Sequence, residues 1–129
     1  MMRIEPTKHT PLVFVDPSKT RVVIAGVCIP ENAYMFFKPL EEQLMTFDPD
    51  QIHEVQFQFR LEFMNTLSSK AFLDFIRMVK DQKQIPVRVI WEYFHDDEEM
   101  KEHGETYSEI MDIPFEFRSV DPAERFPKL

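Results

Sequence analysis

The chain has 129 residues, a formal net charge of −8 and an apolar fraction of 43%, which fit one domain with one core. The acidic balance argues against binding to nucleic acid or anionic membranes, because no basic stripe is present to displace counterions. A glycine-rich phosphate loop is excluded, since Gly26 and Gly104 are the only glycines. The 13 phenylalanines predict an aromatic-rich core.

Three further observations indicate the cellular compartment of the protein. Cys28 is the only cysteine, so an internal disulfide is excluded, as is typical of a reducing compartment. No apolar run approaches the roughly 20 residues that span a bilayer, and residues 1–6 are too short and polar for a signal sequence. We therefore expect a soluble, cytoplasmic protein.

The residue pattern in the first part of the chain predicts a hairpin followed by a helix. After an extended lead-in, apolar runs at 12–15 and 21–26 predict two antiparallel strands. Pro30 is typical of a helix start. Pro39 should divide this helix into segments 31–37 and 39–46, because its ring clashes with the carbonyl group four residues earlier.

The most regular pattern lies in residues 54–79. Apolar side chains first alternate with polar ones, which predicts a half-buried strand. The alternating apolar residues are Val55, Phe57, Phe59, Leu61 and Phe63. The spacing then changes to that of an amphipathic helix. Its apolar residues are Leu67, Ala71, Phe72, Phe75, Ile76 and Val79.

The rest of the chain predicts another strand–helix–strand unit. Alternation beyond Pro86 predicts a strand over 87–94, and residues 97–111 predict a helix interrupted by Gly104. An edge strand is expected at 114–120, followed by a loose tail at 121–129.

The element order β-β-α-β-α-β-α-β predicts an α/β fold. Right-handed crossovers that continue in one direction place their helices on the same face of a sheet. The opposite face should be open, because the central strand carries polar residues there, among them Arg60 and Glu62. We therefore predict a two-layer sandwich with a mixed five-stranded sheet and helices mainly on one face. It forms a single domain over 1–129, with its core at about 7–120.

Polar and hydroxyl side chains crowd the turn between the central strand and its helix. They are Asn65, Thr66, Ser68, Ser69 and Lys70. One such residue is explained by helix capping. The others allow a second interpretation, a phosphorylation site, because a phosphate at a helix start gains N–H donors and a favourable dipole. Glu31 and Asn32 begin the preceding helix and should border the same sheet edge, since both turns follow strands.

Two other functions remain open from the residues alone. The cluster His95, Asp96 and Asp97 suggests a small metal-dependent hydrolase, although its spacing matches neither an EF-hand nor an HExxH pair and fits a solvated helix start better. An unmodified scaffold could instead bind its partner through the polar sheet face, using Arg60 or Glu62.

Short motifs spread over residues 7–120 resemble the SiaC family of bacterial biofilm-regulation phosphoproteins. In chain order they are Thr10-Pro11, Pro30-Glu31-Asn32-Ala33, Phe63-Met64-Asn65-Thr66, Ser68-Ser69-Lys70, Trp91-Glu92-Tyr93, Asp96-Asp97-Glu98-Glu99-Met100 and Ile113-Pro114-Phe115. The sequence departs from the family pattern at Leu67, where a serine is usual, and before Pro30, where Val27-Cys28-Ile29 replaces the usual Ser-Tyr.

The resemblance implies a small cytoplasmic switch protein without catalysis, cofactor or metal of its own. A dedicated kinase would phosphorylate Thr66, and a PP2C-type phosphatase would reverse this. The unphosphorylated form would bind and activate a diguanylate cyclase and so raise cyclic di-GMP. The logic is similar to that of anti-sigma-factor antagonists, whose phosphorylated hydroxyl also lies at a helix start.

Overall fold

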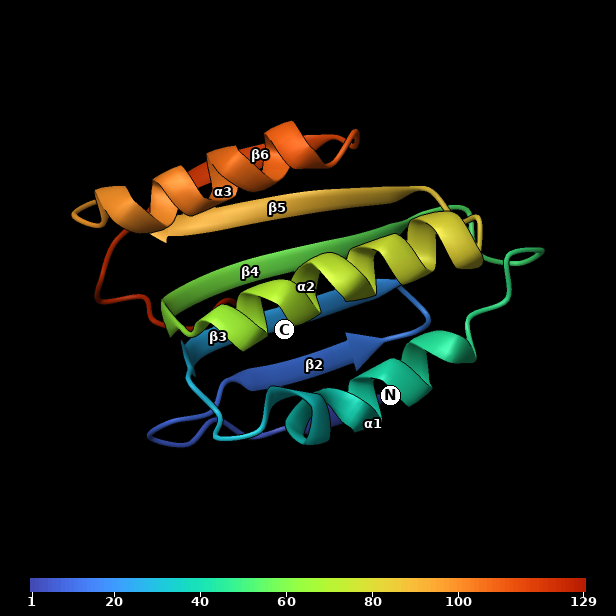
Figure 1. Ribbon diagram of the computed structural model, residues 1–129, viewed down its shortest axis with the longest axis horizontal. Coiled ribbons are helices and arrows are strands. Elements are labelled where there is room, and N and C mark those ends of the chain that lie inside the picture. Colours follow the sequence, from blue (N-terminus) through green and yellow to red (C-terminus); the bar gives the residue numbers. More distant parts are fainter.

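The computed structural model describes all residues, 1–129, and contains one six-stranded sheet with three helices on one face (Figure 1). In chain order the elements are β1 (Met2–Ile4), β2 (Leu12–Asp16), β3 (Arg21–Cys28), α1 (Ala33–Met45), β4 (Val55–Met64), α2 (Thr66–Arg77), a π-helical extension η1 (Met78–Gln82), β5 (Val87–Phe94), α3 (Glu98–Ile110) and β6 (Phe115–Val120). The predicted α/β fold with helices on one face is confirmed, with six strands in place of five.

The strands lie in the sheet in chain order. β1, β2 and β3 are antiparallel neighbours, whereas β3, β4, β5 and β6 are all parallel. Each parallel pair is joined through one helix, and all three helices cover the same face (Figure 1). The carboxyl ends of β3, β4 and β5 and the starts of α1, α2 and α3 therefore meet at one edge of the sheet.

β1 is the strand that the sequence prediction missed. It pairs with β2 from Met2 opposite Val15 to Ile4 opposite Val13. Three residues are too few to show alternation. The strand forms because β2 is buried along most of its length, so the N–H and C=O groups on its outer side need a partner.

The predicted break of the first helix at Pro39 is wrong. α1 continues through Pro39 without interruption. Proline removes the hydrogen bond to the carbonyl group of Met35, and both Pro39 and Met35 lie on the exposed side of α1. Water can therefore satisfy that carbonyl group, which lowers the cost of the missing bond.

Gly104 does not interrupt α3 but allows it to approach the sheet. A Cβ atom on Gly104 would lie 2.6 Å from Cγ of Trp91 on β5. The Trp91 indole N–H donates to the Met100 carbonyl oxygen at 2.9 Å, on the same helix. Glycine is therefore required here by the close contact between α3 and the tryptophan ring.

The main core fills the layer between sheet and helices and is rich in aromatic rings, as predicted. Phe59 on β4 contacts Phe72 on α2 and Trp91 on β5, with ring centroids 5.0 and 5.2 Å apart. Phe37 on α1 contacts Phe72 at 5.6 Å, so the rings link both layers. None of the helices combines the length and apolarity that a membrane crossing requires.

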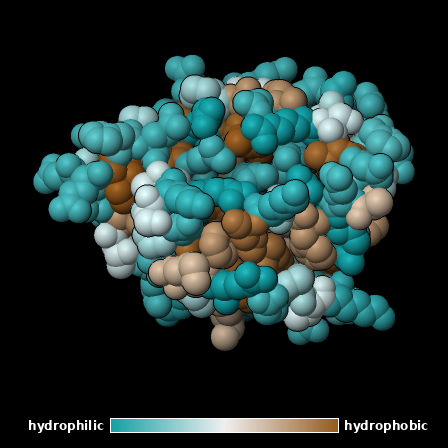
Figure 2. Space-filling model, turned by 180° about the vertical axis from the view of Figure 1, so that it is seen from behind, coloured by the Kyte–Doolittle hydropathy of each residue, from teal (hydrophilic) through white to brown (hydrophobic).

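The opposite face of the sheet is not open, contrary to the sequence prediction. Arg60 and Glu92 form a buried ion pair there, with Arg60 Nε 3.0 Å from Glu92 Oε1. The segment 121–129 contains no helix or strand but crosses this face, since Arg60 donates to the Glu124 carbonyl oxygen at 2.9 Å. Phe126 packs on a small apolar cluster of Leu12, Phe14, Val23 and Ala25. Figure 2 shows this face, where hydrophilic residues surround a smaller hydrophobic area.

Candidate functional site

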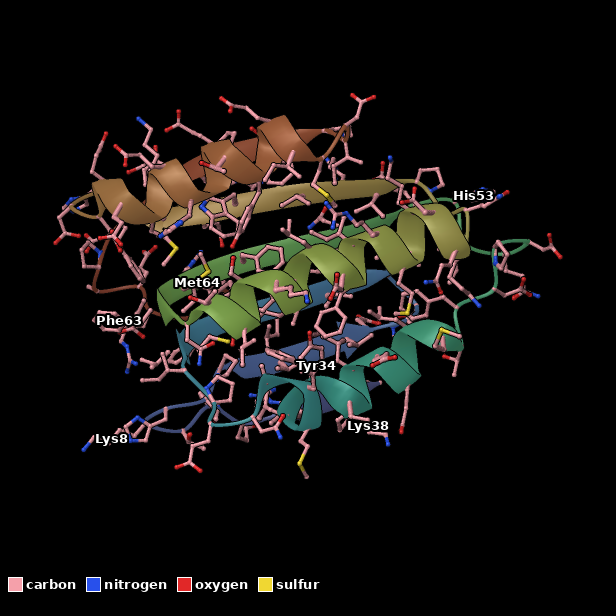
Figure 3. All side chains as sticks on the ribbon, viewed as in Figure 1. Lys8, Tyr34, Lys38, His53, Phe63 and Met64 are labelled. Atoms are coloured by element: carbon pink, nitrogen blue, oxygen red, sulfur yellow. The ribbon has the colours of Figure 1, made fainter.

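Thr66 is the first residue of α2 and lies exposed at the sheet edge where the helices begin. Figure 3 shows Phe63 and Met64, at the end of β4, at this edge and His53 at the opposite end. Asn65, and not Thr66, caps the helix. The Thr66 hydroxyl is therefore accessible and has no capping role.

Asn65 fixes the turn through three hydrogen bonds. Its side-chain oxygen accepts from the Ser68 N–H at 2.9 Å, and its side-chain amide donates to the Pro30 carbonyl oxygen at 3.1 Å. Its backbone N–H donates to the Cys28 carbonyl oxygen at 3.1 Å. The start of α2 is thus tied to the end of β3 and to the residue that leads into α1.

The structure brings Glu31 and Asn32 to the same edge. Asn32 caps α1, since its side-chain oxygen accepts from the Met35 N–H at 3.1 Å. Both Glu31 and Asn32 are exposed. Because Pro30 accepts the bond from Asn65, the turns that begin α1 and α2 form one continuous surface.

The two serines of the turn differ from Thr66 in accessibility. Ser68 is fully buried, and its hydroxyl makes no hydrogen bond to a nitrogen or oxygen atom. Ser69 is half-buried, and its hydroxyl is hydrogen-bonded to the Tyr107 hydroxyl on α3. A kinase can reach neither serine as easily as Thr66. Lys70 is exposed one helical turn beyond Thr66.

Tyr107 is a residue of this region that sequence reasoning missed. Its hydroxyl also donates to Met64 Sδ at 3.6 Å, so it contacts both the end of β4 and the first turn of α2. Burial raises the pKa of Tyr107, and the hydrogen bond from Ser69 lowers it in part. No local pattern could reveal it, because 38 residues separate Tyr107 from Ser69.

Cys28 lies beneath the site without a nucleophilic role. Its side chain is fully buried, and burial raises the thiol pKa to about 12, with a smaller opposing effect from the Ser68 hydroxyl. The thiol is therefore protonated at neutral pH and shielded from solvent.

Exposed apolar side chains lie at the same sheet edge as Thr66, at the ends of β3 and β4 and at the start of α2. Phe63 is 65% exposed, Leu67 is 49% exposed and Ile29 is 38% exposed. The strand alternation had placed Phe63 in the core, but the register between β3 and β4 shifts by one residue just before it. Large apolar side chains gathered on a surface are typical of a protein interaction site. We call Ile29, Phe63 and Leu67, together with Thr66, the switch edge.

The alternative sites are not supported by the geometry. His95 and Asp96 are exposed, and the Asp97 carboxylate caps α3 by accepting from the Met100 N–H at 3.0 Å. No three His, Cys, Asp or Glu side chains gather in a way that could hold a metal ion. Binding through the polar sheet face would use Arg60, which is buried against Glu92, or Glu62, whose carboxylate is paired with Arg125 of the segment that crosses this face.

One family model matches nearly the whole chain. A family model described as SiaC family regulatory phosphoprotein matches residues 4–120. A protein of Pseudomonas aeruginosa (strain UCBPP-PA14), itself uncharacterised, is 28% identical over 122 residues, which are 93% of this chain and 97% of that protein.

Solved structures from Pseudomonas aeruginosa share the fold. A chain in the crystal structure of diguanylate cyclase SiaD in complex with its activator SiaC matches with a TM-score of 0.84 and 27% identity, covering 93% of this chain and 100% of that one. A structure of apo-SiaC matches with a TM-score of 0.75 and 26% identity, covering 92% of this chain and 98% of that one. Since the family model spans nearly the whole sequence, the chain belongs to the SiaC family of regulatory phosphoproteins.

Proposed function

We propose that this protein is a non-catalytic switch whose unphosphorylated form binds and activates a diguanylate cyclase. A protein kinase phosphorylates Thr66, and a PP2C-type phosphatase removes the phosphate. The observation that carries this proposal is an exposed threonine as the first residue of α2, at a sheet edge that also carries exposed apolar side chains.

The turn is well suited to hold a phosphate. Asn65 already occupies the N–H groups of Ser68 and Ser69, through its side-chain and backbone oxygens. The N–H groups of Thr66 and Leu67 have no acceptor within the helix, and they lie at the positive end of its dipole. A phosphate on Thr66 therefore gains donors without disturbing the cap, and Lys70 offsets part of its charge.

The same phosphate would oppose partner binding at the switch edge. It adds about −1.5 to −2 charges next to Leu67 and Phe63. A partner that buries these apolar side chains would also have to remove water from the phosphate, which is costly. The unmodified turn carries no charge at Thr66 and meets no such cost.

The choice of partner is supported by the relatives. The family is described as regulatory phosphoproteins, and SiaC of Pseudomonas aeruginosa is described as the activator of SiaD, with which it forms a complex. Because the proposed kinase would draw on ATP, the proposal includes a cytoplasmic location. A regulatory role without catalysis is supported by the description of the family as regulatory phosphoproteins.

The proposal is tested with the diguanylate cyclase and kinase of the same organism. Thr66→Ala should bind and activate the cyclase in the presence of kinase and ATP, whereas Thr66→Glu should bind at least about tenfold more weakly, a difference of about 1.4 kcal/mol. Calorimetry gives the affinity, and cyclic di-GMP production gives the activation.

Thr46→Glu is the matched control, because Thr46 is an exposed threonine at the other end of α1. Its affinity for the cyclase and its activation of the cyclase should match those of the wild type. Modification found by mass spectrometry only outside residues 65–70, or full cyclase binding by Thr66→Glu, would contradict the proposal.

A further inference from the structure

A groove of about 310 Å³ lies between α1 and α2, on the helical face of the protein. α1 contributes Tyr34, Phe37 and Glu41, and α2 contributes Asp74 and Phe75, with Met78 just beyond its end. This volume is at the lower end of the range for small-ligand sites. The groove therefore accepts a group of the size of one long side chain.

Aromatic rings form the floor and one wall of this groove. Phe37 and Phe75 are buried, and their centroids lie 5.5 Å apart at an interplanar angle of 69°. Tyr34 is 53% exposed and lies where α1 faces α2 (Figure 3). A group that enters the groove would therefore contact aromatic rings.

Two carboxylates without a cationic partner face the groove. Glu41 comes from α1 and Asp74 from α2, and neither lies within 4.0 Å of a Lys, Arg or His nitrogen. No Lys or Arg lines the groove itself, although Lys38 lies one helical turn from Glu41, and Lys70 and Arg77 each lie one turn from Asp74. Neither carboxylate is thus held in a direct ion pair within the protein.

Aromatic rings next to unpaired carboxylates select one ligand class, the organic cation. The face of an aromatic ring attracts a guanidinium or ammonium group, and a carboxylate adds a charged hydrogen bond. An anionic ligand would be repelled by both acids and by the net charge of −8. A divalent metal ion would find too few oxygen ligands.

We propose that the groove between α1 and α2 binds an arginine or lysine side chain of the partner protein, as a second contact beside the switch edge. This inference rests on the proposed function. The groove continues toward the switch edge, because Leu67 lies one helical turn before Ala71, which also lines the groove. On α1, Tyr34 follows the capping residue Asn32 by two positions. One partner surface can therefore cover both places.

The groove and Thr66 are electrically separate. Eight residues of helix place Thr66 about 12 Å from Asp74 along the axis of α2. This exceeds the screening length of about 8 Å at physiological salt. The affinity of the groove for a small free cation should therefore not depend on phosphorylation of Thr66, although the partner protein itself leaves.

The test is an NMR titration of ¹⁵N-labelled protein with N-acetylarginine amide. N-acetylcitrulline amide serves as the neutral probe of the same shape, and spermidine as a free polyamine. Chemical-shift changes should concentrate on amides of residues 34–41 and 71–82, with the citrulline compound binding at least tenfold more weakly.

Variants then distinguish binding in this groove from nonspecific attraction of a cation to the acidic protein. The double variant Glu41→Gln with Asp74→Asn should lose the shift changes, and it should bind the cyclase at least tenfold more weakly. The double variant Glu42→Gln with Asp81→Asn removes the same charge outside the groove and should match the wild type. Equal binding of both blocked amino acids, or an equal loss in both double variants, would overturn the proposal.

The remaining outcomes distinguish the two proposals. If spermidine occupies the groove and N-acetylarginine amide does not, the partner side chain is ruled out as occupant. If Thr66→Glu controls cyclase binding but the groove double variant binds the cyclase normally, the groove proposal fails alone. If the groove double variant loses cyclase binding while Thr66→Glu keeps it, the switch proposal fails and the groove proposal stands.

Discussion

The side chain of Asn65 joins the starts of two helices, because its amide donates to the Pro30 carbonyl oxygen at 3.1 Å while its oxygen caps α2. Asn32 caps α1 in the same way but makes no second bond of this kind. The pair offers a direct comparison between a cap alone and a cap that also connects two turns.

Replacement of Asn65 by alanine should destabilise the protein more than the same replacement at Asn32. Loss of a cap costs about 1 kcal/mol, and loss of the bond to Pro30 adds about another 1 kcal/mol. Urea unfolding followed by circular dichroism measures both changes. Equal losses for Asn65→Ala and Asn32→Ala would show that the bond to Pro30 contributes nothing.

Gly104→Ala should destabilise the protein, although alanine is the better helix former by about 1 kcal/mol. The added Cβ would meet the Trp91 ring, which packs against the helix. Relief of this overlap requires α3 or Trp91 to move, at a cost of roughly 1–3 kcal/mol. Urea unfolding followed by Trp91 fluorescence measures the change. Glu102→Ala, on the exposed side of the same helix, should stay within about 0.5 kcal/mol of the wild type.

Glu92→Gln should cost about 3–5 kcal/mol, because it leaves Arg60 buried without its counter-charge. The change keeps the shape of the side chain, so the loss reports on charge and hydrogen bonding. Chemical denaturation measures it. Glu116→Gln removes an exposed partner of Arg118 and should cost less than about 1 kcal/mol. A small effect at Glu92 would mean that Arg60 can reach water in spite of the covering tail.

Stability should fall as pH rises from 8 to 10, in part because of Cys28. Its pKa is raised from 9.0 to about 12 in the folded protein, so the unfolded chain releases the thiol proton first. The stabilising contribution is complete below pH 9 and is lost as pH approaches 12. At pH 10 the loss is about 1.4 kcal/mol.

The measurement compares urea unfolding of the wild type and Cys28→Ala at both pH values. The variant should lose less stability over the interval, since it lacks this group. The pKa of Tyr107 is raised in both proteins, because burial is the largest cause and the charge of Cys28 only the smallest, so most of this contribution cancels in the comparison. Identical pH profiles would show that the Cys28 thiol titrates normally.

Sequence reasoning succeeded where short-range patterns determine the structure. The alternation of β4 and the helical spacing of α2 depend on neighbours a few residues apart, and they placed Thr66 at the junction. The regular alternation of strands and helices also predicted that the helices lie mainly on one face of the sheet. These features require no knowledge of distant contacts.

Features that depend on distant contacts could not be predicted. β1 forms only because β2 needs a partner. Phe63 is exposed because the register between β3 and β4 shifts just before it. The bond between Ser69 and Tyr107 and the groove between α1 and α2 both arise from helix packing, which no local spacing encodes.

The tail that crosses the back of the sheet has a consequence for folding during synthesis. Arg21 at the start of β3 donates to the Lys128 carbonyl oxygen at 2.8 Å, across 107 residues of sequence. Contacts this far apart in sequence form late, because a long loop must close first. On the ribosome, the apolar cluster beneath Phe126 therefore stays uncovered until segment 121–129 has emerged, and chaperones have that interval in which to bind it.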